Sequence, residues 1–381
     1  MRILIAPNAF KGTLSAGEAG EAAAGAVREV LPSARAEVLP IADGGDGLLE
    51  ALRPVLGGRL VTSRVEGPLG RKLAARWLLA GRTAVIEMSE AAGLRRMGGR
   101  ALRPMEATTA GVGSLMLEAV RRGAKELVIG LGGSASNDGG AGCAQAFGFS
   151  LLDAAGRPVP PGAAGAGLLK RILPGSAAAR LRGVKVTGLA DVRNPLCGRL
   201  GSARVFGPQK GAGPREVAAM EKALRDYAAA VRRELGVSIS SLPGGAAAGG
   251  LGAGLAAFFG ASLEDGSSFV LSRLGFERKL AAADLLITGE GRFDEQTFYG
   301  KAPGAALAAA KRLGKPAVVV CGRSLLRGGA LRRRGVSLLV EAGAARDEAG
   351  AVRRALVKAL PGFLRRPGGS VQRLRKPPPF C

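Results

Sequence analysis

The chain of 381 residues carries 55 lysine and arginine residues against 30 aspartate and glutamate residues, which gives a formal net charge of +25 at pH 7. It contains no histidine, and this excludes the commonest general base and the commonest metal ligand from any mechanism. Hydrophobic residues make up 47% of the chain, enough to bury a sizeable core, and the length favours two domains.

The excess of basic residues raises nucleic acid as a partner, but the rest of the composition argues against it. Aromatic residues, which stack on bases, make up only 4% of the chain. The basic residues are spread along the chain, and the pairs Arg95–Arg96 and Arg121–Arg122 are interpreted as solvated helix ends. Because a basic surface also attracts anionic small molecules, we expect small-molecule substrates and keep a basic RNA-binding protein as a minor alternative.

No segment has the composition of a signal peptide or of a membrane span. Residues 235–263 carry no charge, but they are rich in Gly, Ser and Ala and predict a loop followed by a helix of small residues. The four cysteines, Cys143, Cys197, Cys321 and Cys381, form no CxxC pair and have no metal-binding spacing. We therefore expect reduced thiols in a cytoplasmic protein that has no membrane partner.

In chain order, the N-terminal segment predicts alternating strands and helices. A short apolar run over Arg2–Pro7 predicts a strand. Ser15 and Glu18 have the spacing of a capping box at the start of a helix that extends to about Leu31. A second strand is expected over residues 36–42, followed by a short helix.

The pattern changes after about Arg59. Residues 60–70, 72–81 and 83–88 read as neighbouring β segments joined by turns that contain glycine, and they are more typical of antiparallel than of crossover connections. Residues 125–130 form the next expected strand. A glycine-rich segment and a helix over Ala141–Phe147 follow it.

The strand and helix alternation returns near the C-terminus. We expect one parallel sheet from strands around Arg2, Val38, Leu285, Val318 and Leu338. The economical arrangement is a discontinuous α/β domain, residues 1–60 plus 283–368, with a second α/β domain of residues 61–282 inserted into it. Function is then expected in the crevice between the domains, near the carboxyl ends of the parallel strands. Residues 369–381, rich in Arg and Pro, are expected to be a disordered tail.

The glycine-rich segment GLGGSASNDGGAG, residues 130–142, follows a predicted strand. It matches neither the P-loop nor the dinucleotide-binding spacing. Its glycines expose backbone N–H groups, Ser134 and Ser136 add donors, and a helix is expected to begin near Asn137 or Asp138, so the segment is suited to holding phosphate. A tight turn capped by Asp138 is equally compatible with these residues, and the spacing of the glycines does not distinguish between the two interpretations.

Acidic side chains follow apolar runs at three places, each among glycines, and a lysine follows the first strand. These residues are Asp43, Asp46, Asp191, Glu290, Asp294 and Lys11. Any one of them alone is more typical of a cap or a turn. Together with Arg292 and three glycine-rich segments, residues 130–142, 207–213 and 244–254, they indicate phosphoryl transfer, with Asp as base or Mg²⁺ ligand and Lys and Arg against developing charge.

Seven segments, in order, resemble the signature blocks of the bacterial glycerate kinases of the class II family. They contain APNAFKGTLSA, PIADGGDG, GLGGSASNDGGAG, ADVRNPLCG, VFGPQKGA, GAAAGGLGAGLAAF and ADLLITGEGRFDEQTFYGKAPG. The resemblance implies ATP-dependent phosphorylation of D-glycerate, usually to 2-phosphoglycerate, in a cytoplasmic enzyme that uses Mg²⁺. It also implies a Rossmann-like or flavodoxin-like parallel-sheet domain with a second α/β domain inserted, and it is compatible with a homodimer. A kinase for another small hydroxy or sugar acid is the alternative.

Roles follow from this hypothesis and the chemistry of the side chains. The catalytic residues are expected to be Asp191, which orients or deprotonates the attacking hydroxyl, together with Lys11 and Arg292, which neutralise negative charge. The expected substrate- or phosphate-binding residues are Ser134, Asn137, Asp138, Asn194, Lys210 and Glu290. The candidate Mg²⁺ ligands are Asp43, Asp46 and Asp294. Since Mg²⁺ usually takes one or two protein carboxylates, not all three are expected to bind it.

Overall fold

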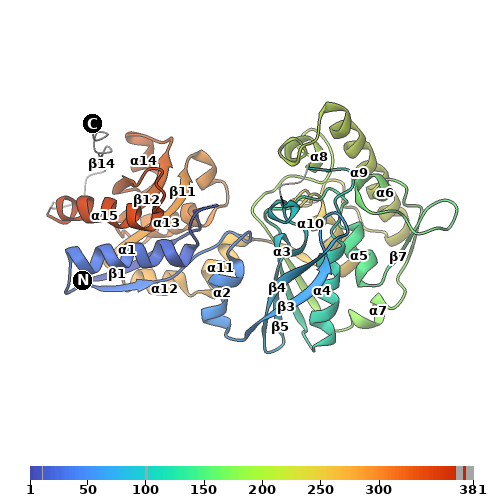
Figure 1. Cartoon of the computed structure of the whole chain (residues 1–381), viewed down its shortest axis with the longest axis horizontal. Helices are drawn as coiled ribbons and strands as arrows, with labels where there is room; N and C mark the ends of the chain where they lie inside the picture. Colours follow the sequence, from blue (N-terminus) through green and yellow to red (C-terminus); the bar gives the residue numbers. More distant parts are fainter. Residues whose placement is uncertain (11, 99–101, 366–371, 375–381) are drawn as a thin grey trace. The chain divides into compact units, whose positions relative to one another are not determined.

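The computed structural model describes residues 1–10, 12–98, 102–365 and 372–374 (Figure 1). The chain forms two compact units, each described by itself below. Unit 1 contains Met1–Asp43, Glu50–Val55 and the segment from Gly266 onward, and unit 2 contains Gly44–Leu49 and Leu56–Asp265. The sequence-based limits placed residues 266–282 in the inserted domain, whereas by its contacts this segment groups with unit 1.

Unit 1 is built on a six-stranded sheet in the order β14-β13-β12-β11-β1-β2, in which every neighbouring pair is parallel. The strands are β1 (Arg2–Pro7), β2 (Arg35–Val38), β11 (Leu285–Phe293), β12 (Ala317–Ser324), β13 (Leu338–Glu341) and β14 (Gln372–Leu374). The predicted parallel sheet and α/β fold class are confirmed. β14 lies inside the segment expected to be a tail, and the other residues of that segment, 369–371 and 375–381, lie outside the described residues.

Helices cover this sheet because its strands are apolar on both sides. Ile3 and Ile5 face a core shared with α1 (Ala16–Val30) and α15 (Glu348–Leu364), and the alternate residue Leu4 is also buried (Figure 1). Ser15 and Glu18 form the predicted capping box of α1. The other helices that lie wholly within unit 1 are α11 (Gly266–Arg273), α12 (Phe276–Ala281), η3 (Glu295–Phe298), α13 (Ala302–Arg312) and α14 (Gly329–Arg333).

The connections of this sheet reverse direction between β1 and β11. β1 leads through α1 to β2 on one side, whereas β11 leads through α13 to β12 on the other side. Such a switch point leaves a crevice beyond the carboxyl ends of the two strands, which is where open α/β sheets bind ligands. The fold of unit 1 therefore predicts a binding site next to the residues that follow β1 and β11.

Unit 2 contains a mixed six-stranded sheet in the order β10-β9-β6-β5-β4-β3. β3, β4 and β5 pair antiparallel, as the sequence predicts, and β5, β6, β9 and β10 pair parallel. Its strands are β3 (Arg59–Glu66), β4 (Lys72–Ala80), β5 (Thr83–Glu87), β6 (Glu126–Gly130), β9 (Lys185–Ala190) and β10 (Ser262–Asp265), with a separate hairpin of β7 (Ser150–Leu152) and β8 (Arg171–Leu173).

The helices of unit 2 surround this sheet with small, buried side chains. They are α3 (Ser89–Ala92), η1 (Leu94–Met97), α4 (Ala110–Arg121), α5 (Ala141–Phe147), α6 (Gly162–Ala166), α7 (Ala177–Arg180), α8 (Ser202–Phe206), η2 (Pro208–Lys210), α9 (Pro214–Leu235) and α10 (Leu251–Phe259). α2 (Leu48–Leu56) is divided between the two units. None of the helices in the described residues is both long and apolar enough to cross a membrane.

The glycine-rich segment differs from its prediction at one point. Helix α5 begins at Ala141, not near Asn137 or Asp138. Gly139 and Gly140 have φ values of 65° and 83°, in the left-handed region, so the backbone cannot be α-helical before Ala141. The uncharged stretch before Leu263 does form the expected loop and small-residue helix, α10.

Candidate active site

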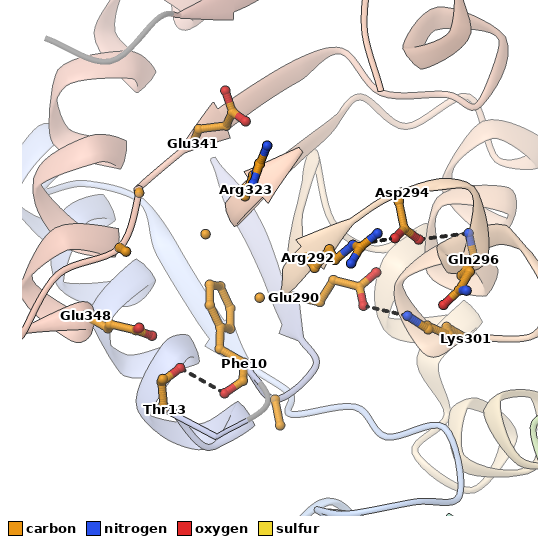
Figure 2. Close-up of a pocket in the computed structure, with 15 residues that line it drawn as sticks. Phe10, Thr13, Glu290, Arg292, Asp294, Gln296, Lys301, Arg323, Glu341 and Glu348 are labelled. Atoms are coloured by element: carbon orange, nitrogen blue, oxygen red, sulfur yellow. Dashed lines mark hydrogen bonds and ion pairs between the residues drawn. The ribbon is translucent and has the colours of Figure 1, made fainter. Parts of the chain in front are cut away.

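A cavity of about 890 Å³ lies at the carboxyl edge of the unit 1 sheet (Figure 2). It is lined by residues at the carboxyl ends of β11, β12 and β13 and by residues that follow β1, β11 and β13. The cavity therefore occupies the crevice that the reversal between β1 and β11 predicts. Its charged lining residues are Glu290, Arg292, Asp294, Lys301, Arg323, Glu341 and Glu348.

Glu290 is a buried carboxylate of this cavity. Its Oε1 accepts a hydrogen bond from Thr297 Oγ1 at 2.5 Å, and its Oε2 pairs with Lys301 Nζ at 3.4 Å (Figure 2). Burial raises the pKa of Glu290, and the neighbouring charge of Asp43 raises it further, against the opposing effects of Thr297 and Lys301. Thr297 and Lys301 were absent from the predicted site, although both lie in the last signature block of the sequence.

Arg292 and Asp294 form an ion pair at the rim of the cavity. Arg292 Nε lies 2.7 Å from Asp294 Oδ2, and the arginine side chain is 70% exposed. Asp294 Oδ1 also accepts the backbone N–H of Gln296 at 2.9 Å and so caps η3. Both oxygens of Asp294 are thus engaged within the protein, which makes it a weaker candidate for a metal than a carboxylate facing open space.

Asp43 is the remaining predicted acid of unit 1. It is buried, and Asn8 Nδ2 donates a hydrogen bond to its Oδ2 at 3.4 Å. Lys11, expected to act in catalysis, lies outside the described residues. Within the described ranges no three Asp, Glu, Cys or His residues are grouped closely enough to hold a metal ion.

In unit 2, a buried lysine forms hydrogen bonds with the glycine-rich segment. Lys210 ends η2, is only 3% exposed, and donates hydrogen bonds to Ser134 Oγ at 2.7 Å, Ser136 O at 2.6 Å and Asn137 Oδ1 at 3.5 Å. Burial lowers the pKa of Lys210 to about 7, although Asp138 favours its charged form. All three donors of its ammonium group are directed at the segment. Lys210 therefore positions the segment.

Asp138 anchors the same segment to α4. Its carboxylate is fully buried and accepts hydrogen bonds from the backbone N–H groups of Thr109, Gly140 and Gly142, at 2.8, 3.1 and 3.2 Å, and from Thr109 Oγ1 at 2.9 Å. Burial raises the pKa of Asp138 in spite of these bonds. The bonds from Gly140 and Gly142 agree with the interpretation of Asp138 as a residue that caps a turn. The bonds from Thr109 were not indicated by the sequence.

The glycine-rich stretches of unit 2 pack against one another. A Cβ on Gly249 would lie 1.8 Å from Ser136 O, and one on Gly254 would lie 2.4 Å from Gly139 O. Close approach of two backbones therefore explains these glycines. Ser136 Oγ is buried and, within the part of the chain that the structure describes, has no hydrogen-bond partner. An unsatisfied donor in such a segment is typical of a place that binds water or a ligand.

Asp191 follows β9 directly and is half-buried. The register places the ends of β5, β6 and β9 side by side, so Asp191 lies at the same sheet edge as the start of the glycine-rich segment. Asn194 has a structural task, because its Nδ2 donates to Leu200 O at 2.8 Å and its backbone carbonyl accepts from Ala246 N at 3.1 Å.

A second acidic group at this edge was missed. Glu87 ends β5, and its Oε1 accepts the backbone N–H groups of Gly47 and Leu49 at 3.1 and 2.9 Å. Burial raises the pKa of Glu87 to about 7. The position of Glu87 after an apolar strand-like run is the same signal that singled out Asp191, so the sequence could have identified it.

Arg95 and Arg96 were predicted to be solvated helix ends, and their side chains are 41% and 28% exposed, but the prediction did not include their acidic partner. Both pair with the buried Glu90, and Arg95 Nη2 lies 2.8 Å from its Oε1. Asp46 belongs to the same cluster, since its Oδ1 accepts from Ser89 Oγ at 2.5 Å and lies 3.7 Å from Arg95 Nη2. Asp46 is therefore held in unit 2 by a hydroxyl and a guanidinium.

The chain was compared with known proteins. Residues 3–360 match the model described as the glycerate kinase family. The chain is 41% identical over 322 residues to a glycerate kinase of Halalkalibacterium halodurans, covering 84% of this chain and 85% of that protein. It is 40% identical over 324 residues to the glycerate 2-kinase of Escherichia coli, covering 84% and 85%.

The fold agrees with a solved structure. The crystal structure of a Salmonella typhimurium protein assigned as glycerate kinase 2 is similar with a TM-score of 0.82 and 39% sequence identity, and the match covers 96% of this chain and 100% of that chain. The resemblance of the seven signature blocks is confirmed by these matches. The chain belongs to the glycerate kinase family.

Proposed function

We propose that this protein is a glycerate kinase that transfers the γ-phosphoryl group of ATP to the 2-hydroxyl of D-glycerate and releases ADP. The observation that carries the proposal is the match to the family over residues 3–360, which includes every residue assigned a role here. The name of the Escherichia coli relative, a glycerate 2-kinase, supports the choice of the 2-hydroxyl.

Asp191 is the proposed base. In the transfer, the hydroxyl oxygen forms a bond to the γ-phosphorus, the bond from that phosphorus to the β,γ-bridging oxygen breaks, and ADP leaves with the electron pair. The hydroxyl proton passes to the carboxylate of Asp191. Its half-buried position at the carboxyl end of β9 suits this role, because a carboxylate there is held by the sheet and remains accessible.

The glycine-rich segment is the proposed anion site of unit 2. Ser134 and the orphaned hydroxyl of Ser136 supply donors, and the glycines leave the backbone open to an oxyanion. Asp138 and Lys210 are proposed to shape this site by fixing the segment on either side. We therefore propose positioning roles for these two residues, which the sequence suggested as direct ligands.

The donor set of unit 1 fits a hard divalent cation. Asp43 and Glu290 are buried carboxylates near enough for the charge of Asp43 to raise the pKa of Glu290, and a cation between them would remove that repulsion. Mg²⁺ binds through one or two carboxylates plus substrate phosphates and water, so it does not require a larger acidic cluster. We propose that Asp43 holds Mg²⁺ beside Glu290, whose two oxygens are already engaged by Thr297 and Lys301. When bound, Mg²⁺ would neutralise phosphate charge.

Arg292 and Lys11 are proposed to stabilise negative charge on the phosphoryl group or on the glycerate carboxylate. The guanidinium of Arg292 is largely exposed at the cavity rim, where it can reach a ligand. A cytoplasmic location and a homodimer remain predictions.

The test is an assay of ADP release with D-glycerate, with L-glycerate and without an acceptor, followed by ³¹P NMR of the product. Release that requires D-glycerate, with phosphate on C2, is expected. Phosphate on C3 would correct the regiochemistry, and turnover with a different hydroxy acid alone would correct the substrate. Absence of acceptor-dependent turnover together with salt-sensitive RNA binding would favour the RNA-binding alternative.

A further inference from the structure

Two arginines stand side by side at the carboxyl edge of the unit 1 sheet. Arg292 on β11 and Arg323 on β12 are register partners on neighbouring parallel strands, and both are exposed to the cavity (Figure 2). Like charges at neighbouring positions of a sheet destabilise it. Such a pair is favourable when an anion binds between the two guanidinium groups, since each can donate two parallel hydrogen bonds to a phosphate.

The two arginines differ in the partners that the protein gives them. Arg292 pairs with Asp294, whereas Arg323 forms no ion pair with any residue in the described part of the chain. The other acids of the cavity are largely engaged elsewhere. Glu290 binds Thr297 and Lys301, and Glu341 accepts the backbone N–H of Ser324 at 2.7 Å. Glu348, in the first turn of α15, is the remaining acid of the lining.

The cavity is also built for a ligand larger than a three-carbon acid. Its volume of about 890 Å³ lies at the upper end of the range for sites that bind whole cofactors and drug-sized molecules. Gly291 and Gly322 precede the two arginines, and both line the cavity. The strand ends therefore present backbone without a side chain at these two positions, which permits close approach of a phosphate chain.

We propose that this cavity binds the triphosphate of the nucleotide and that Arg323 contacts its phosphates directly, beside Arg292. This proposal rests on the proposed function, which requires a nucleotide. It goes further because it names unit 1 as the unit that binds the nucleotide, and because Arg323 is not among the site residues predicted from the sequence. Lys301, which pairs with Glu290, also lines the cavity and adds positive charge to it.

The test compares Arg323→Met with Arg327→Met. Arg327 follows β12 by a few residues, is exposed and does not line the cavity, so its substitution removes the same charge from the same part of the chain. Binding of ADP with Mg²⁺ is measured by titration calorimetry, and KM is measured separately for ATP and for D-glycerate. Arg323→Met is expected to raise the Kd for ADP and the KM for ATP about tenfold or more, the effect of losing a charge-assisted hydrogen bond, with the KM for D-glycerate unchanged. Arg323→Lys should recover part of the loss, because it keeps the charge without the planar fork.

Several outcomes would overturn the proposal. A higher KM for D-glycerate with unchanged ADP binding would assign the cavity to the acceptor. Equal ADP binding by Arg323→Met and Arg327→Met, or no ADP binding by the wild-type protein, would remove Arg323 from the nucleotide site. The proposed function fails separately: wild-type protein that binds ADP in an Arg323-dependent way but never phosphorylates D-glycerate retains the nucleotide site and loses the assigned acceptor.

Discussion

Charged side chains lie near the carboxyl edge of each sheet, but they differ in their exposure to solvent. In unit 1, Arg292 and Arg323 are exposed, and the charged groups line an open cavity. In unit 2, Asp138 and Lys210 are buried, and their oxygens and hydrogens are bonded to the glycine-rich segment. The two arginines of unit 1 are therefore available to a ligand, whereas Asp138 and Lys210 of unit 2 mainly determine the shape of a backbone.

This difference predicts how substitutions should divide between activity and stability. Removing an exposed charge leaves no buried group unpaired and should change mainly binding. Removing a buried charge leaves several donors or acceptors unsatisfied and should change mainly stability. Asp191 is half-buried, and its substitution should affect turnover most. Its effect is the reference against which substitutions of exposed and of buried charges are compared.

Asp191→Asn is expected to produce the largest effect. Loss of the proposed base should lower kcat about 100- to 10,000-fold, the usual contribution of general base catalysis, with little change in the melting temperature. The measurement is ADP release with D-glycerate together with thermal unfolding. Asp226→Asn is the control, since Asp226 forms an exposed pair with Lys222 on α9 and should retain kcat within a factor of about two. Near-normal turnover of Asp191→Asn would transfer the role of base to another residue.

Asp138→Ala should be the most destabilising of these substitutions. It leaves the N–H groups of Thr109, Gly140 and Gly142 without their acceptor in a buried place, at a cost of about 3–5 kcal/mol. Urea unfolding should show the loss, and the amides of Gly140 and Gly142 should exchange hydrogen faster. The matched substitution in unit 1 is Asp347→Ala, which removes an exposed helix cap that binds Gly350 N and should cost about 1 kcal/mol. Equal losses at the two sites would contradict the comparison between the units.

The stability of unit 2 should depend on the protonation of Lys210. The pKa of Lys210 falls from its ordinary 10.5 to about 7 on folding, so between these values the unfolded chain holds more protons than the folded one. Raising the pH through this interval therefore stabilises the wild-type fold, by at most about 1.4 kcal/mol per pH unit, and below about pH 7 the cost of burying the charge is fully present. Asp138 is the opposite charge that faces the ammonium group.

The check is the pH dependence of the free energy of unfolding for the wild type and Lys210→Met. The variant should lack the increase with pH, because methionine carries no proton to release. Lys222→Met, an exposed substitution on α9, should keep the wild-type slope. Parallel slopes for the wild type and Lys210→Met would mean that Lys210 stays protonated in the folded protein throughout this range.

The sequence predicted the framework because strands and helices are recorded in local patterns. The runs that begin at Arg2 and Leu285 are short, apolar and followed by glycine or proline, and they form adjacent strands of one sheet as expected. β14 was missed because it lies in a segment whose composition is typical of disorder. The start of α5 was misplaced because glycine permits both helical and left-handed backbone, and only the fold decides between them.

The candidate site was predicted in its positions more than in its contacts. Residues such as Asp191 and Glu290 were found because they follow apolar strands. Their partners come from distant parts of the chain, as Thr109 does for Asp138, and no local spacing records that proximity. Arg95 shows the same limit, because its local sequence is typical of a solvated helix end and does not indicate the ion pair with the buried Glu90.

Of the predicted effects, that of Arg292→Met on the free energy of unfolding should be the smallest. This substitution tests directly whether an exposed arginine of unit 1 acts in binding and not in stability. Asp294 would keep its bond from Gln296 N after the substitution, so the free energy of unfolding should change by less than about 1 kcal/mol. The value of kcat/KM for ATP should fall about tenfold, since one charge-assisted contact to phosphate is lost. Arg312→Met is the control, because Arg312 forms an exposed pair with Glu277 and does not line the cavity.

A stability loss of Arg292→Met as large as that of Asp138→Ala would mean that the exposed arginine holds the fold and that the two edges do not differ in kind. A fall in kcat/KM without a loss of stability has the opposite meaning. The ion pair with Asp294 would then serve to hold Arg292 at the cavity rim, so that its guanidinium is oriented before the nucleotide arrives and less conformational entropy is lost on binding.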